Sequence, residues 1–358
     1  MSTIIDQDIR KAETLPSAYY TDDTTFLEVK RGFAHYWHFA CHQSQLSESN
    51  ILPLNHMEHL IGEPMMITAG DEVRCVSNVC THRGMIIVDK HCSTQTLQCP
   101  YHGRTFGLDG RFRGMPEFEG VVGFPSPSDD LEQFPTLKWK GIIFTGTKPS
   151  GFEAFLDELN NRLAWMPIES FEHDPSRHRS YEIDANWALY VDNYLEGFHI
   201  PFVHKDLHGS LDYDSYRTEL FDGGVLQIGI ASENEISFDL PDSSPDFGKR
   251  VAAYYYWIFP GLMLNFYPWG LSVNIVTPLS VDRTRITYHG FVGDLSTLGR
   301  GAGGDLDKVE AEDQEIVEAT QRGVSSGSYD RGRYSPSRET GVHRFHMMLT
   351  SGREIDNH

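Results

Sequence analysis

The segment LQCPYHGRTF, residues 97–106, decides how the first half of this sequence is interpreted. Within it, Cys99 and His102 stand three residues apart, and a glycine follows the histidine. The upstream segment CTHRG is of the same kind, with Cys80 and His82 two residues apart and a glycine close behind. Each segment offers one thiolate and one imidazole, and its glycine lets the backbone turn closely around an ion. The two segments together predict a metal centre with two Cys and two His ligands.

Two kinds of metal centre use this set of ligands. Zinc binds two Cys and two His tetrahedrally, whereas in a Rieske [2Fe–2S] cluster two His replace two Cys on one iron. Zinc sites usually space their first two ligands as a pair of Cys, but here each segment is mixed. A binuclear cluster needs this mixture if both segments contribute to both irons. We therefore predict a Rieske cluster, with zinc as the alternative, on the ligands Cys80, His82, Cys99 and His102.

The pattern of the sequence changes at residues 148–151, KPSG, whose composition is typical of a linker. Residues from about 27 to 145 contain short β-like runs, namely HYWHFAC, MMITA, EVRCVSNV, MIIVD and KGIIFTG. The later part contains helical patterns, namely FEAFLDELNNRLAWM, NWALYVDNYLEGFH and DLDKVEAEDQEIVEATQRG. Several longer strands lie between the last two of these. We predict a small antiparallel β domain, followed by a larger sheet with helices.

A second candidate metal site lies in the stretch NWALYVDNYLEGFHIPFVH. If this stretch is helical, Asp192, Glu196 and His199 share one face. His204 lies off that face, but the helix should end or kink before Pro201, which would bring His204 back beside His199. Two imidazoles and one carboxylate form the facial triad of non-haem Fe(II) oxygenases, which leaves positions open for dioxygen and substrate.

The carboxylate of this triad must come from another part of the chain, and VEAEDQEIVEATQRG is the best source. A helical repeat places Asp313 in the middle of an apolar face formed by Val309, Ile316, Val317 and Thr320. A carboxylate in that position is costly unless it is paired or binds a metal. We therefore predict Asp313 as the third ligand, with Glu312 on the flank as the alternative, and expect Glu315 and Glu318 to be solvated.

Both cluster segments resemble the loops of Rieske non-haem iron ring-hydroxylating oxygenases. Respiratory Rieske proteins carry an extra Cys in each loop, where this chain has Met85 and Tyr101. The stretch NWALYVDNYLEGFHIPFVH is similar to the iron-binding helix of the same family, and the resemblance covers nearly the whole chain. The common oxygenase loop has Trp after its second Gly, whereas this chain has Arg104. We expect Arg104 to change the surface that the cluster presents without removing a ligand.

The resemblance implies an α+β protein. Residues 1–35 would form an N-terminal segment that packs on the catalytic domain, and residues 36–148 an antiparallel β Rieske domain. Residues 149–358 would form a C-terminal helix-grip catalytic domain, an antiparallel sheet with helices that holds the mononuclear iron.

The resemblance also implies the terminal oxygenase (alpha) subunit of a multicomponent enzyme. Such a subunit uses O₂ and carries one [2Fe–2S] Rieske cluster and one mononuclear Fe(II). A separate reductase, with or without a ferredoxin, would supply electrons, and the chain would form a head-to-tail homotrimer. Glu196 would bridge a Rieske histidine of a neighbouring subunit to the iron site, and Asn193 and Asp192 would support this path.

Glu196 also bears on the substrate, because most ring dioxygenases have Asp at the corresponding position. Glu there, together with the segment EDQEIVEATQRGVSS, resembles the carnitine, choline and glycine betaine monooxygenases. This implies a small quaternary ammonium substrate, hydroxylated next to nitrogen and in some cases N-dealkylated. The runs YYYWIF and NFYPWG offer aromatic faces for a cation, although aromatic strand residues usually pack. The alternatives are hydroxylation or O-demethylation of an aromatic acid, and a Rieske electron carrier with a vestigial second domain.

The composition excludes several other classes of protein. A formal charge of −21 over 358 residues disfavours binding to nucleic acid or to an anionic membrane. No apolar run approaches the length of a membrane span, and the N-terminal MSTIIDQDIRK lacks the apolar core of a signal peptide. Five cysteines are too few for a disulfide scaffold. We expect a cytoplasmic protein.

Overall fold

The computed structural model describes residues 5–204, 209–304 and 306–351. The chain divides into two compact units. One is Ala34–Ser150, and the other joins the residues before it to those from Gly151 onward. Antiparallel sheets dominate both units, which confirms the predicted α+β class and the order of a small β domain before a larger sheet.

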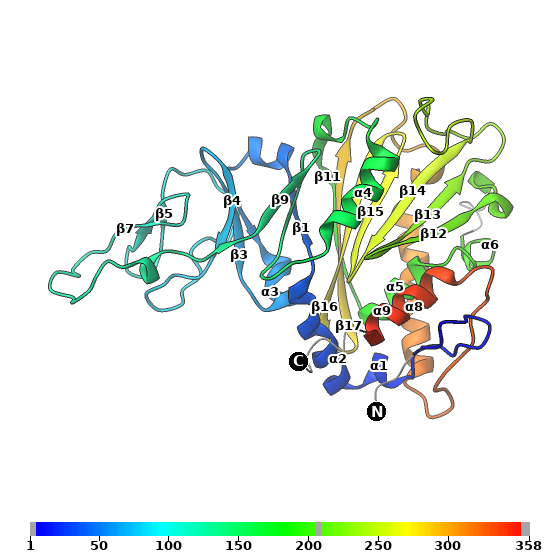
Figure 1. Ribbon diagram of the computed structural model, residues 1–358, viewed down its shortest axis with the longest axis horizontal. Helices are drawn as coiled ribbons and strands as arrows, with labels where there is room; N and C mark the ends of the chain where they lie inside the picture. Colours follow the sequence, from blue (N-terminus) through cyan, green and yellow to red (C-terminus); the bar gives the residue numbers. More distant parts are fainter. Residues whose placement is uncertain (1–4, 205–208, 305, 352–358) are drawn as a thin grey trace. The chain divides into compact units, whose positions relative to one another are not determined.

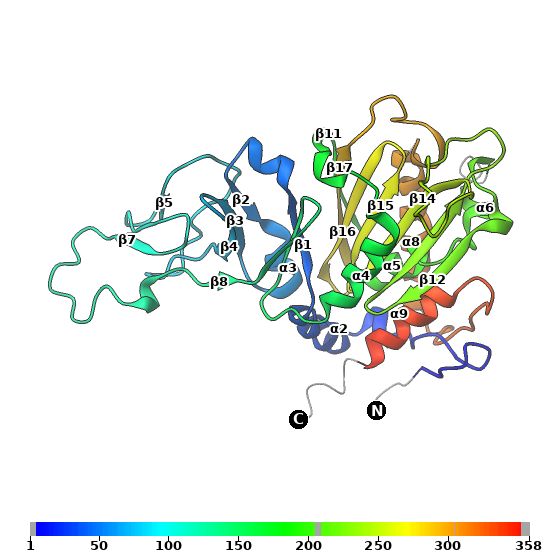
Figure 2. The same ribbon diagram turned by 45° about the horizontal axis from the view of Figure 1, so that its top comes forward.

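Three small antiparallel sheets build the Ala34–Ser150 unit (Figures 1 and 2). The first has the order β1 (His38–His42), β10 (Ile142–Thr145), β9 (Thr136–Trp139). The second has the order β2 (Ile51–Leu54), β3 (Met65–Ala69), β4 (Val73–Ser77), β8 (Gln133–Phe134). The third has the order β5 (Leu97–Gln98), β6 (Thr105–Phe106), β7 (Phe112–Gly114). Three short helices join them, η2 (Gln43–Ser47), α3 (Asn55–Ile61) and η3 (Pro127–Asp129).

The core of this unit anchors both predicted cysteine ligands. Cys80 and Cys99 are each 2% exposed and pack in one cluster with Ile51, Met66, Val76, Leu97 and Phe106. A rigid β scaffold therefore fixes the base of each ligand loop.

Four of the five predicted strand runs in this region contain strands, and MMITA coincides with β3. The prediction for MIIVD was wrong, because this run forms only an isolated bridge between Val79 and Ile86. The side chain of Asn78 takes the place of a neighbouring strand there. Its amide donates to the Val88 carbonyl at 2.6 Å and accepts from the Val88 N–H at 2.9 Å. Hydrophobic composition cannot reveal such a side-chain substitute for a strand partner.

A seven-stranded antiparallel sheet forms the centre of the other unit (Figure 1). Its order is β11 (Glu172–Ile183), β17 (Arg283–Val292), β16 (Gly270–Ser280), β15 (Leu262–Tyr267), β14 (Val251–Ile258), β13 (Gly224–Ile230), β12 (Arg217–Phe221). Strands β12 to β17 thus pair with their neighbours in sequence, and β11 is the edge strand that pairs with β17.

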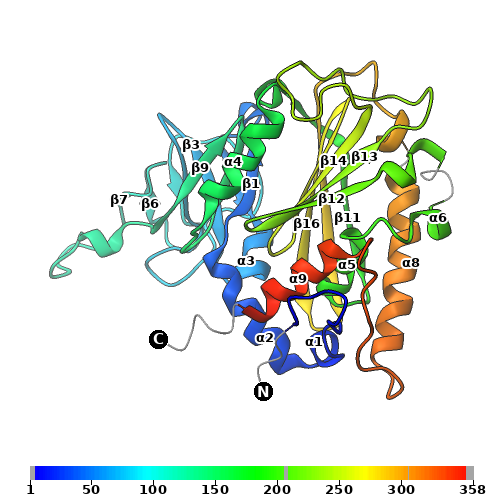
Figure 3. The same ribbon diagram turned by 45° about the vertical axis from the view of Figure 1, so that its right-hand side comes forward.

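Helices accompany this sheet, and Figure 3 shows the long α8 beside α5. The helices are η1 (Gly32–His35), α1 (Ala18–Thr21), α2 (Asp23–Arg31), α4 (Phe152–Leu163), η4 (Ile168–Ser170), α5 (Trp187–Tyr194), α6 (Ile200–Val203), η5 (Tyr213–Ser215), η6 (Gly301–Gly303), α8 (Leu306–Val324) and α9 (Thr340–Ser351). No helix among the described residues has the length and apolar character that crossing a bilayer requires.

A row of polar side chains crosses the large sheet. Gln227 lies opposite Tyr255, Tyr255 opposite Asn265, and Asn265 opposite Ser272. Directly opposite residues of antiparallel strands share a face of the sheet, so this row points to one side. The hydroxyl of Tyr194, at the end of α5, donates to Asn265 Oδ1 at 2.6 Å. The polar row therefore forms the floor of a space between the sheet and α5.

The stretch with the predicted iron-binding histidines is not one helix, because α5 ends well before α6 begins. The prediction that Asp192, Glu196 and His199 share one face of a helix was therefore wrong. Pro201 excludes one continuous helix, since its ring would clash with the preceding turn, but α5 already ends at Tyr194. In the first turn of α6 it costs no hydrogen bond. His199 lies directly before α6 and His204 directly after it, so this short helix sets their spacing.

The predicted apolar face of α8 was only partly right. Val317 is buried, but Ile316 is 40% exposed and Thr320 is also exposed. The buried face instead includes the polar Gln321, whose side chain accepts from the Asn186 N–H at 2.8 Å. A hydrophobic repeat cannot find a face whose buried positions are partly polar.

Candidate active site

The two cluster loops have the same backbone geometry. In each, the cysteine N–H donates to the carbonyl five residues ahead, and the glycine four residues ahead donates to the cysteine carbonyl, with distances from 2.8 to 3.1 Å. The pairs are Cys80–Met85, Gly84–Cys80, Cys99–Arg104 and Gly103–Cys99. Both glycines have left-handed backbones, with φ of 72° and 73°, which other residues adopt at a cost. The repeated turn gives both cysteines the same local setting.

The cysteine side chains of these loops are buried more deeply than the histidine side chains. The Cys80 and Cys99 thiols are buried, and burial raises the pKa of Cys80. The His82 and His102 rings lie further out, with their centroids 4.8 Å apart. A buried thiol of raised pKa needs a nearby cation to become a thiolate, so this arrangement of donors suits a metal centre.

A single zinc ion fits these four residues poorly. Tetrahedral bonds of about 2.0 to 2.3 Å would hold all four ligand atoms within about 4 Å of one another. Among the described residues, no three of these four have ligand atoms all within 4.8 Å of each other. Two sulfurs on one side and two imidazoles on the other are what a binuclear cluster requires.

Arg104 does not change the surface around the cluster, and that expectation was wrong. Its side chain is 2% exposed, and its guanidinium lies over the rings of Phe106, Phe112 and Phe124 at 4.9 to 5.8 Å. Its Nη2 donates to Asp129 Oδ1 at 2.6 Å. Because its carbonyl also accepts from the Cys99 N–H, Arg104 ties the second cluster loop to η3.

We expect Arg104→Met to destabilise the Ala34–Ser150 unit by about 2 to 4 kcal/mol, because it removes the buried cation that pairs with the partly buried carboxylate of Asp129. Denaturant unfolding followed by the visible absorbance of the cluster measures this loss. The double variant with Asp129→Asn should lose less than the two single variants combined, since both then lack the charge. If the free energy of unfolding of Arg104→Met lies within about 0.5 kcal/mol of the wild-type value, this role of Arg104 is contradicted.

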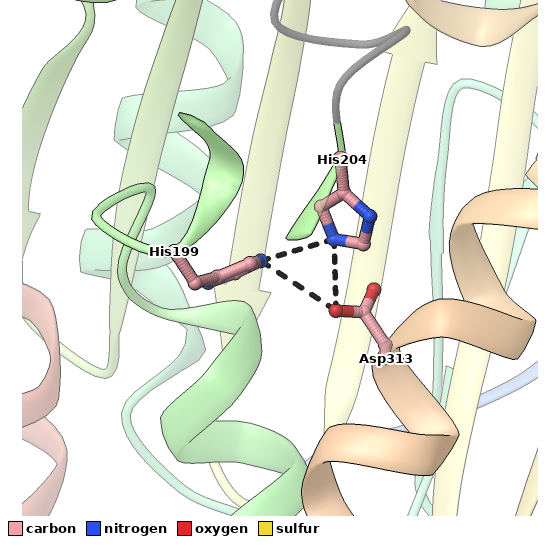
Figure 4. Close-up of side chains that lie close together, drawn as sticks. All are labelled: His199, His204 and Asp313. Carbon is pink, nitrogen blue, oxygen red and sulfur yellow. Dashed lines mark hydrogen bonds and ion pairs between the residues drawn. The ribbon is translucent and has the colours of Figure 1, made fainter. Parts of the chain in front are cut away.

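The side chains of His199, His204 and Asp313 converge on one point (Figure 4). The His199 and His204 Nε2 atoms are 3.1 Å apart, and Asp313 Oδ1 lies 2.9 Å from His204 Nε2 and 3.5 Å from His199 Nε2. Three atoms bound at right angles to one ion, with bonds of about 2.1 Å, would be about 3 Å apart. The observed spacing therefore suits a facial set of three ligands.

The contacts of the two Nδ1 atoms indicate which nitrogen of each imidazole is available to an ion. His199 Nδ1 lies 2.7 Å from Glu196 Oε1, and His204 Nδ1 lies 2.8 Å from Glu312 Oε2. Because these nitrogens donate to carboxylates, both Nε2 lone pairs point toward each other and toward Asp313. Three acceptors that face one point repel one another unless a proton or a metal ion lies among them, so this donor set suits a metal ion. Glu312 lies on the outer side of His204, whereas Asp313 occupies the ligand position.

The other predicted residues lie at different distances from this centre. Asp192 accepts from the Tyr20 hydroxyl and pairs with His346, both at 2.8 Å, so both of its oxygens have partners outside the set of three converging ligands. Asn193 lines the pocket beside the histidines. Tyr255 and Tyr267, from the aromatic runs, also line this pocket. Other large aromatic side chains of those runs are fully buried, namely Tyr254, Tyr256, Trp257, Phe266 and Trp269.

The sequence does not predict the place of Glu310 and of two tyrosines beside it in this site. Glu310 lines the same pocket, and its carboxylate accepts from the hydroxyls of Tyr190, at 2.7 Å, and Tyr288. Its position one helical turn before Asp313 was the available signal. The two tyrosines come from α5 and β17, so no local pattern could have paired them with it.

Comparison with known proteins decides the family. Residues 170–351 match the model of the ring hydroxylating alpha subunit (catalytic domain), and residues 36–134 match the Rieske [2Fe–2S] domain. The chain belongs to the ring-hydroxylating oxygenase alpha-subunit family. This oxygenase therefore carries a Rieske [2Fe–2S] cluster, and its catalytic domain binds mononuclear iron.

Known relatives share both domains. The chain is 28% identical to choline monooxygenase of Arabidopsis thaliana, over 95% of this chain and 83% of that protein. It is 26% identical to the oxygenase subunit of carnitine monooxygenase of Escherichia coli K12, over 95% and 94%. Its fold matches a quaternary ammonium Rieske monooxygenase with a TM-score of 0.81 at 24% identity, over 98% and 100%. A naphthalene 1,2-dioxygenase from Rhodococcus sp. matches with a TM-score of 0.75 at 18% identity, over 95% and 94%.

Proposed function

We propose that this protein is the terminal oxygenase component of a multicomponent enzyme that hydroxylates a small quaternary ammonium compound at a carbon next to nitrogen. The balanced reaction is C–H + O₂ + 2 e⁻ + 2 H⁺ → C–OH + H₂O, and the resulting hemiaminal can lose an aldehyde. The observation that carries this proposal is the pocket beside the three converging ligands. Tyrosine rings and carboxylates line it, and none of the described residues that line it is a lysine or an arginine.

The two proposed metal centres use different residues and carry out different chemistry. We assign the cluster to Cys80, His82, Cys99 and His102, and the iron to His199, His204 and Asp313. When bound, the cluster transfers single electrons and the iron activates O₂. Glu196 and Glu312 hold the two iron-binding imidazoles in one tautomer and orientation.

We also propose that a separate reductase, with or without a ferredoxin, supplies the electrons, and that the protein acts as a homotrimer. The E. coli relative is by its name one subunit of a larger enzyme, which supports the first of these. In the trimer, Glu196 would link a cluster histidine of the neighbouring subunit to His199. Its contact with His199 Nδ1 supplies one half of that link.

The test of this function is O₂ consumption with a surrogate reductase. Choline, glycine betaine and carnitine serve as quaternary ammonium probes, and benzoate represents the aromatic acids of the competing function. We expect O₂ uptake with at least one quaternary ammonium compound, with hydroxylated or dealkylated product in equal amount. Uptake coupled to product with benzoate alone would overturn the proposal.

Glu196→Gln should slow electron transfer between the centres by at least about tenfold, because the amide is neutral and a weaker partner for imidazolium and imidazole N–H groups. Stopped-flow reoxidation of the reduced cluster, with substrate and O₂ present, measures the rate. Iron content and the cluster spectrum serve as controls and should not change. Equal reoxidation rates in variant and wild-type protein would show that the path does not use this carboxylate.

A further inference from the structure

Glu310 is a half-buried residue, and its carboxylate is not one of the three converging iron ligands. Its Oε2 atom accepts from the hydroxyls of Tyr190 and Tyr288, and the same two hydroxyls lie 2.7 Å apart. Burial, together with the negative charge of Asp313, raises the pKa of Glu310 to about 7. None of the ion pairs among the described residues includes Glu310.

A carboxylate in such a setting lacks the usual compensation for burial. Buried charges are normally paired with an opposite charge or bound to a metal, but two neutral phenols are all that hold Glu310. These phenols fix the carboxylate in place, at the wall of the pocket that also contains His204 and Asp313. A cation that enters this pocket as part of a substrate would supply the missing charge.

The tyrosine rings that line the pocket suit the apolar surface of such a cation. The rings of Tyr194, Tyr216, Tyr255 and Tyr267 line it, and those of Tyr255 and Tyr267 meet edge to face with centroids 5.9 Å apart. The faces of aromatic rings attract alkylammonium groups through their quadrupoles. Tyrosine rings and one fixed carboxylate are therefore arranged around the same space.

Two carboxylates of this space that are not iron ligands would repel a substrate carboxylate. Among the described residues of the lining, these are Glu196 and Glu310, whereas the charge of Asp313 is offset by the iron that it binds. The arginines of the adjoining hollow, which shares Glu310 with the pocket, are already engaged. Arg177 lies over the Trp269 ring at 4.8 Å, and Arg179 pairs with Asp307 at 3.6 Å.

We propose that Glu310 is the counter-charge for the cationic nitrogen of the substrate, and that this oxygenase selects monocations of the choline type over zwitterions that also carry a carboxylate. This inference rests on the proposed function and names its substrate class. Glu310 is thereby a specificity-determining residue that acts on binding.

The test compares equilibrium binding of matched ligands to the iron-loaded protein, without reductant, by isothermal titration calorimetry. Choline is compared with 3,3-dimethylbutan-1-ol, in which carbon replaces the charged nitrogen, and with carnitine. The variants are Glu310→Gln, which keeps the shape of the side chain, and Glu315→Gln, which removes an exposed charge from the same helix. Iron content and the cluster spectrum confirm that each variant is folded.

In the wild-type protein and in Glu315→Gln, choline should bind at least about tenfold more tightly than the neutral alcohol and more tightly than carnitine. In Glu310→Gln, the preference for choline over the alcohol should fall to about twofold or less, through loss of choline affinity alone. The inference is overturned if Glu310→Gln keeps the preference, if carnitine binds more tightly than choline to the wild-type protein, or if no cation binds. Turnover of a quaternary ammonium compound combined with either of the first two results would leave the proposed function standing, whereas the absence of any cation binding would count against both.

Discussion

Asp313→Ala should lower the rate of O₂-dependent turnover by at least about 10³-fold, while the visible absorbance of the cluster remains. Asp313 Oδ1 is the one carboxylate oxygen among the three ligand atoms that converge in Figure 4. Without it, two neutral imidazoles must hold a divalent ion alone, and the charge that favours iron at this site is lost. The wild-type protein should contain about three irons per chain and the variant about two, because only the mononuclear site empties.

Elemental analysis and the visible spectrum measure this outcome together. Glu312→Ala is the informative comparison, since Glu312 touches only the outer nitrogen of His204. It should keep most of its iron and show a smaller loss of activity. If Glu312→Ala loses the third iron and Asp313→Ala keeps it, the assignment of the carboxylate ligand is reversed. Two irons per chain in the purified wild-type protein, without O₂-dependent turnover, would instead support an electron carrier.

Cys99→Ser should remove the cluster altogether, with loss of its visible absorbance and of all turnover supported by reductase. Cys99 is assigned as one of the two thiolate ligands, and its side chain is 2% exposed in the core of its unit. Metal binding contributes directly to folding where ligands come from such a core, so the Ala34–Ser150 unit should also melt at a lower temperature. The hydroxyl of serine is a harder, less acidic donor and cannot replace the thiolate.

The control for this variant is Cys92→Ser. Cys92 is half-buried, lies outside both ligand loops and pairs through its backbone with Ile51. Its variant should keep the absorbance of the cluster and most of the activity. A cluster that survives in Cys99→Ser but disappears in Cys92→Ser would require a different set of ligands.

The sequence by itself determined those features whose causes lie within a few residues. The two cluster loops are closed by hydrogen bonds between residues four or five apart, and their left-handed glycines stand at fixed spacings from the cysteines. The position of Pro201 required a break in any long helix through the histidines, although the sequence did not place the end of α5 correctly. The alternation of strands and turns likewise indicated two β-rich domains.

Only the tertiary structure decided which side chains meet across the chain. Asp313 reaches His204 over a separation of 109 residues, and Glu310 meets Tyr190 over 120. Strand register and helix packing fix such contacts, and a helical repeat alone misplaced the buried face of α8. The burial of Arg104 under three phenylalanine rings has the same origin, since those rings come from separate turns and strands. Local spacing can therefore supply the chemistry of each ligand, but the choice of partner depends on packing energies summed over the whole fold.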